Sequence, residues 1–178
     1  MRGTLRRLLA LLVLSVCATG CGGGGGQVAP DTWAGSVCTA LHPWRDQITS
    51  LNAQAASQMA TATTPQQTRD NMLRLLDGAR LASERARAQV AAAGVPDVPD
   101  GQQIAGRFVA ALAAVRDAYR TAHDTVAGFS TREPKAFYDG VSRAVATLNT
   151  SYARAGVDTG RLASADLRAS FARATPCR

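Results

Sequence analysis

Residues that commonly carry acid–base or metal chemistry are scarce in this chain of 178 residues. The histidines are His42 and His123, and the glutamates are Glu84 and Glu133. Neither an H-E-x-x-H motif nor a carboxylate three positions from a histidine occurs, so the ligand pattern of a helical metal site is missing. An ion pair and a helix cap account for the glutamates, although two distant aspartates could still meet in the fold. We therefore predict no catalytic residue, no metal ion, no cofactor, and a protein that is not an enzyme.

His123 is followed directly by Asp124, which invites comparison with the histidine–aspartate pair of a hydrolase triad. Neighbours on a helix point about 100° apart, because a turn takes 3.6 residues. We therefore expect the two side chains not to face each other, and we place His123 on the polar, exposed side of its helix.

The residues best suited to bind a ligand are aromatic. In His42-Pro43-Trp44 a proline interrupts a helical pattern and frees a backbone carbonyl about one turn earlier, beside two ring side chains. These two rings, His42 and Trp44, make up our candidate ligand pocket together with Tyr119 and Tyr152. The alternative is that Trp44 and both tyrosines pack in the core, with the tyrosine hydroxyls hydrogen-bonded.

Helices must position these side chains, because apolar residues recur at steps of three and four over most of the chain. The stripe from Trp33 to Met59 predicts a first helix that begins at Asp31 or Thr32. Pro43 either kinks this helix or divides it into two helices in line. Further stripes predict helices over about 65–93, 101–129 and 131–155 and a short fifth helix over 165–173.

Capping residues separate these helices. Thr64-Pro65-Gln66-Gln67 forms a capping box, and similar signals start at Asp100, at Ser130 and at Ser164. Gly94 is placed to end the second helix. Because the connections are short and strand-type alternation is absent, the sequence predicts an all-α fold, an up-down-up-down four-helix bundle with a short C-terminal fifth helix and one disulfide.

The N-terminus has the layout of a secretory signal. Arginines at positions 2, 6 and 7 precede the apolar run 8–14, which is too short for the roughly 20 residues that cross a bilayer. Ala18-Thr19-Gly20-Cys21 then resembles the lipobox of bacterial lipoproteins. The resemblance implies lipidation of Cys21 and removal of residues 1–20. Residues 21–31, with five glycines, would then be a flexible tether, and residues 32–178 the helical domain.

Ordinary signal cleavage after Ala18 is the alternative, since lipoboxes usually have leucine at that position. It would leave a secreted protein with a spare thiol on Cys21. Lipidation accounts for the cysteines better. Cys17 leaves with the signal and Cys21 carries lipid, so Cys38 and Cys177 remain to form a disulfide in an oxidising compartment.

Charge gives little support to nucleic-acid binding. Loss of the three signal arginines lowers the formal charge from +7 to +4, and no basic run interleaved with aromatics follows. We therefore predict no nucleic-acid partner.

The whole chain resembles small, alanine- and arginine-rich actinobacterial cell-envelope lipoproteins that are uncharacterised. The resemblance rests on the lipobox-like residues, on Trp33-Ala34-Gly35-Ser36-Val37-Cys38 and on Pro176-Cys177. It implies a helical domain anchored by lipid at the outer face of the cytoplasmic membrane, with no catalytic residues to transfer. We expect a non-catalytic module that binds an envelope protein. The alternative function is a carrier or sensor with a cavity for a small apolar ligand between helices.

Overall fold

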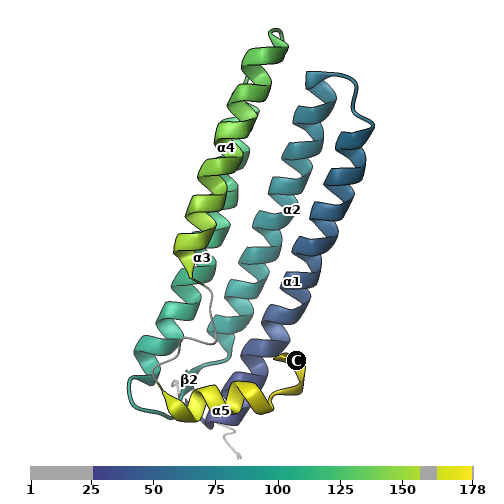
Figure 1. Cartoon of the computed structure of the whole chain (residues 1–178). Coiled ribbons are helices and arrows are strands. Elements are labelled where there is room, and N and C mark those ends of the chain that lie inside the picture. The colour runs from purple at the N-terminus through teal and green to yellow at the C-terminus, as the bar shows by residue number, and fades with distance from the viewer. Residues whose placement is uncertain (1–25, 157–163, 178) are drawn as a thin grey trace, which may run out of the picture.

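The chain folds mainly into helices. The computed structural model describes residues 26–156 and 164–177, and Figure 1 shows four long helices side by side with a short helix across one end. The helices are α1 (Pro30–Ala60), α2 (Pro65–Ala92), α3 (Gly101–Ala127), α4 (Pro134–Ala155) and α5 (Ala165–Arg173), followed by the 3-10 turn η2 (Thr175–Cys177). The prediction of a helical fold with a short C-terminal helix is confirmed. The predicted leader, Cys21 and residues 22–25 lie outside the described residues.

The first helix passes through Pro43 without a break. α1 is one helix of 31 residues, so of the two predicted alternatives the structure has the single helix and not two helices in line. Leu41 and Trp44 on either side of the proline are buried, while Pro43 itself is exposed. Burial of these two side chains therefore holds the chain in one continuous helix, although Pro43 lacks one backbone hydrogen bond.

The fold begins earlier than the sequence pattern indicates. α1 starts at Pro30, with Ala29 at the N-cap and no side-chain cap, and not at Asp31 or Thr32. Ahead of it, β1 (Gln27–Val28) pairs in parallel with β2 (Val95–Pro96). The amide of Asp97 also donates to the carbonyl of Val28 over 2.8 Å. Residues 27–31, expected as tether, are thus part of the folded body.

The predicted helix caps agree with the structure in part. The Thr64–Gln67 capping box is confirmed at the start of α2, and Ser164 caps α5 as predicted. Asp100 occupies the N-cap position of α3 as predicted, but its backbone is left-handed, with φ 60°, and it makes no side-chain cap bond. The prediction of a cap at Ser130 is wrong. α4 begins after Glu133, where Pro134 supplies the fixed φ of a first helical residue.

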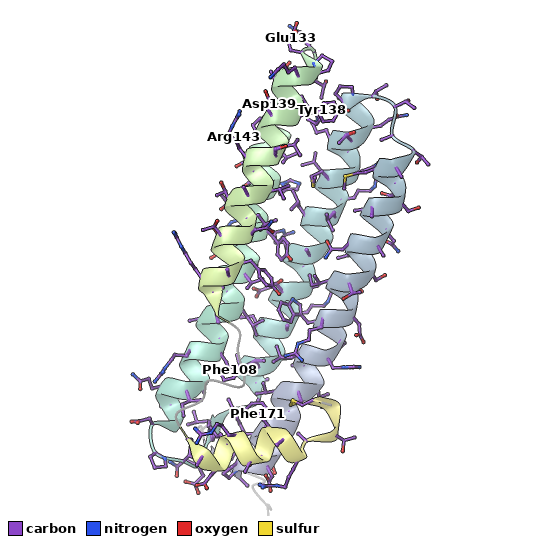
Figure 2. The ribbon with its side chains drawn as sticks, in the orientation of Figure 1. Phe108, Glu133, Tyr138, Asp139, Arg143 and Phe171 are labelled. Carbon is purple, nitrogen blue, oxygen red and sulfur yellow. A yellow bond between two sulfur atoms is a disulfide. The ribbon has the colours of Figure 1, made fainter. Side chains whose placement is uncertain are left out.

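An aromatic cluster closes the end of the molecule that carries β1, β2 and α5. Trp33 lies edge-on to Phe108 and to Phe171, with ring centroids 5.5 and 5.8 Å apart. Figure 2 labels Phe108 and Phe171 at this end of the molecule. The predicted disulfide is confirmed: Cys38 in α1 is bonded to Cys177 in η2, with their Cα atoms 5.1 Å apart. α5 is thus held to the rest of the protein by packing and by a covalent bond.

Each of the helices α1 to α3 packs against the helix that follows it in the sequence, whereas α5 packs against α1. α2 lies against both α1 and α3, while α4 packs on α3 and only touches α2. The turns 61–64 and 128–133 lie at the end opposite α5 (Figure 1). α4 therefore packs mainly on α3, and another side of α4 is not covered by any described helix. Within the described residues, no helix has the length and apolar character that crossing a bilayer requires.

Candidate functional site

The candidate pocket of the sequence analysis is dispersed in the structure. His42 is exposed, with its Nε2 3.3 Å from the Oδ2 of Asp46 on the next turn of α1. Trp44 points inward and donates its indole N–H to the Oγ of Ser83 on α2. A hollow of about 180 Å³ between α1 and α2 is lined by Pro43 and Trp44 and not by His42. The two rings beside the proline are therefore not brought together.

The structure does pair the two tyrosines. The rings of Tyr119 on α3 and Tyr152 on α4 lie edge to face, 6.3 Å between centroids. Tyr119 is 8% exposed and Tyr152 40% exposed. Burial raises the pKa of the Tyr119 hydroxyl to about 12. It also raises the pKa of Tyr152, against an opposing effect of the Arg45 guanidinium. Both hydroxyls are thus neutral packing groups at ordinary pH.

His123 and Asp124 correct another expectation. The Nδ1 of His123 lies 3.0 Å from the Oδ1 of Asp124, although they are adjacent on α3. Rotation of two flexible side chains at the helix surface overcomes the divergence of their Cβ directions. The carboxylate is exposed, so the contact is a surface pair. Elsewhere in residues 26–156 and 164–177, no group of three or more His, Cys, Asp or Glu side chains could hold a metal ion.

A hollow lies between α3 and α4, and sequence reasoning missed it. This groove has a volume of about 640 Å³ and is open to solvent. We call it the α3–α4 groove. Its walls are mostly small side chains: on α3 Ala114, Ala118, Thr121, Ala122 and Thr125, and on α4 Gly140, Ala144, Thr147, Ser151 and Ala155. Small residues at steps of three and four on both helices were the signal that could have indicated it.

The groove forms because α3 turns its large apolar residues elsewhere, whereas Leu148 of α4 lines it. On α3 the stripe with Leu112, Val115 and Val126 is buried in the core. At one end, Gly140 lets Phe129 approach α4, since a Cβ at Gly140 would lie 3.1 Å from the Phe129 ring. The ring therefore closes one end of a groove whose floor has few atoms beyond Cβ.

Charges at the groove differ between its two edges. On the α3 side, Asp117 is bound by the Nε of Arg116 at 2.9 Å and by Arg120 at 3.1 Å. The hydrogen bond from Arg116 holds the pKa of Asp117 below its usual value, so the carboxylate is charged and compensated. On the α4 side, Arg143 and Arg154 line the groove.

The α4 edge carries uncompensated positive charge. Among the contacts of residues 26–156 and 164–177, neither the Arg143 nor the Arg154 side chain has a hydrogen bond or an ion pair. Figure 2 shows Arg143 projecting from α4 away from the α1 and α2 side, while Tyr138 projects toward α2. The groove thus combines an apolar floor with two guanidinium groups that can bind a partner.

Comparison of the chain with protein-family models, with curated proteins and with solved structures finds no match. We therefore infer the function from the geometry of the molecule and from its sequence.

Proposed function

We propose that this protein is a lipid-anchored lipoprotein of the cell envelope that acts as a non-catalytic interaction module at the outer face of the cytoplasmic membrane. Two features support the location: the signal layout that ends at Cys21, and a disulfide between the two cysteines outside the predicted signal and anchor, Cys38 and Cys177. Disulfides persist in oxidising compartments. The resemblance to small actinobacterial lipoproteins agrees with this location.

The anchor is tested by Cys21→Ser. The variant should move from the membrane fraction to the soluble fraction and lose incorporation of a fatty-acid label. Cys17→Ser is the matched control, because it removes a cysteine from the predicted signal and should leave the membrane association unchanged. Retention of Cys21→Ser in salt-washed membranes would refute the lipid assignment and leave ordinary cleavage after Ala18 in question as well.

The α3–α4 groove carries the proposal of an interaction module. A site for a small molecule usually encloses most of its ligand, in contrast to this groove, which is open along one side. A polypeptide that lies in the groove would bury the apolar floor and remain partly exposed itself. This comparison favours protein binding over the alternative of a carrier or sensor for a small apolar ligand.

Site-specific crosslinking in cells tests this function. A photo-crosslinking residue in place of Ala118, in the groove, should capture a defined envelope protein. The same residue in place of Ser57, exposed on α1, should not. Thr147→Trp, which fills the groove, should abolish the capture. Native mass spectrometry that finds a bound small molecule, displaced by Thr147→Trp, would support the carrier instead.

For the fold, we propose that the four long helices form an up-down-up-down bundle. The packing of consecutive helices and their short connections support this topology. It places Ser57, near the end of α1, and Ala136, near the start of α4, at the same end. Spin labels at these exposed positions should therefore be separated by less than the length of α1, which is about 46 Å for 31 residues.

A further inference from the structure

We propose that the α3–α4 groove binds an α-helix of a partner protein that presents small side chains to the groove floor and two carboxylates about three turns apart to the α4 edge. The inference rests on the proposed function and adds the chemistry of the partner. Three features of the groove support it: its length, the small side chains of its floor and the charges at its edges.

The length of the groove fits a helix. Its lining runs along α4 from Gly140 to Ala155 and along α3 from Ala114 to Thr125, with Phe129 in the turn after α3. At 1.5 Å per residue, the α4 wall is about 22 Å long, which corresponds to about four helical turns. A trough between two packed helices is the shape in which a third helix seats its side chains. The geometry therefore favours a helical segment of about 15 residues over a compact ligand.

The floor suits close helix packing. Glycine, alanine and serine side chains let helix axes approach to the lower end of the usual 8–10 Å. Two of the three threonine hydroxyls that line the groove already donate hydrogen bonds: Thr125 donates to the carbonyl of Thr121 over 2.7 Å, and Thr147 donates to the carbonyl of Arg143 over 3.0 Å. A partner helix would therefore leave neither hydroxyl without a hydrogen bond when it excludes water.

The charges at the edges of the groove determine whether a positively or a negatively charged partner is favoured. Arg143 and Arg154 are eleven positions apart, which returns to almost the same face of α4 after about three turns, or about 16 Å. The acidic groups nearby already have partners. Asp117 is bound by two arginines, Asp124 contacts His123, and Asp139 is bound by Lys135 at 2.8 Å. The α4 edge therefore favours a partner that carries negative charge.

Two synthetic helical peptides test the inference. Both are alanine-rich, and they differ only in two residues eleven positions apart, which are glutamates in one and lysines in the other. The full-length lipidated protein in nonionic detergent should bind the glutamate peptide about tenfold more tightly at low ionic strength, since two exposed pairs are attractive in one case and repulsive in the other. Added salt should reduce the difference.

Charge reversal supplies the matched variants. Arg143→Glu combined with Arg154→Glu should invert the preference, so that the lysine peptide binds more tightly. Arg85→Glu combined with Arg132→Glu makes the same change in net charge at exposed positions outside the groove and should leave the preference unchanged. Circular dichroism checks that both double variants are folded.

The outcomes separate the inference from the proposed function. Equal binding of both peptides that Thr147→Trp blocks would overturn the charge assignment, while the groove would still bind helices. Binding of neither peptide, or a preference that Arg143→Glu and Arg154→Glu leave unchanged, would overturn the inference. The function itself fails only if the crosslink from position 118 is also absent in cells.

Discussion

The indole Nε1 of Trp44 on α1 donates a hydrogen bond to the Oγ of Ser83 on α2 over 3.1 Å, and that hydroxyl in turn donates to the carbonyl of Ala79 over 2.8 Å. Trp44 is 5% exposed and Ser83 is 0% exposed. The hydroxyl is therefore used both as acceptor and as donor in a place that water does not reach. This contact joins α1 to α2 within the core.

Ser83→Ala should lower the free energy of unfolding by about 1–3 kcal/mol, because it leaves the buried indole N–H without an acceptor. Urea unfolding measures the loss. In a Trp44→Phe background the same substitution should cost less, since phenylalanine has no N–H to satisfy. An equal loss in both backgrounds would show that the hydrogen bond is not the cause.

Removal of the disulfide should destabilise the protein strongly. The bond joins residues 139 positions apart. The loop-entropy model assigns a loop of that size about 5 kcal/mol, before any strain in the native state is subtracted. Cys38→Ser, Cys177→Ser and the double variant should lose similar amounts of stability. A double variant much less stable than either single variant would contradict a simple cross-link.

Stability should fall in acid partly through Glu84. Hydrogen bonds from Arg87 and then from Arg116, at 2.6 and 2.8 Å, lower the pKa of this carboxyl from 4.5 to about 2. Because the folded pKa lies below the unfolded one, the stabilisation is complete above about pH 5 and is lost as the pH falls from 4.5 toward 2.

Glu84→Gln tests this dependence. The difference in unfolding free energy between wild type and variant should be constant above about pH 5 and should shrink toward about pH 2. Urea titrations at several pH values provide the measurement. A difference that stays the same over the whole acid range would mean that another group carries the acid sensitivity.

Two glycines on α3 should respond in opposite ways to alanine. A Cβ at Gly101 would lie 2.0 Å from the carbonyl oxygen of Pro96, so Gly101→Ala forces the backbone apart and should cost about 1–3 kcal/mol. At Gly106 no atom lies within 4 Å of the position that a Cβ would take, so Gly106→Ala should stabilise the protein by up to about 1 kcal/mol. Thermal melting distinguishes the two, and loss of stability in both would refute the steric argument.

Features encoded within a few residues were predictable from the sequence. The Thr64–Gln67 capping box and the bounds of α5 after Ser164 depend on neighbours in the chain, and both are found in the structure. The Cys38–Cys177 bond was predictable because the predicted signal and anchor leave no other cysteine to pair.

Apart from the disulfide, the features that depend on distant segments were not predictable. The pairing of Gln27 with Val95 joins two extended stretches that only the packed helices bring together. The α3–α4 groove was not predicted, because large apolar residues indicate a core whereas small residues line this groove. Small residues on two helices indicate a groove only once it is known that the two helices are neighbours. His42 and Trp44 were grouped by sequence proximity, yet one is exposed and the other is buried.

The bond between Cys38 and Cys177 also determines how the molecule would carry a mechanical load. If the N-terminus is anchored as proposed and a partner held between α3 and α4 is pulled away from it, the tension reaches Cys38 and divides there between two covalent routes. One runs through the rest of α1 and α2 into α3, and the other crosses the disulfide and returns through α5 into α4. Each route bears only a share of the force, so the domain resists unravelling better than a chain with a single path between anchor and partner.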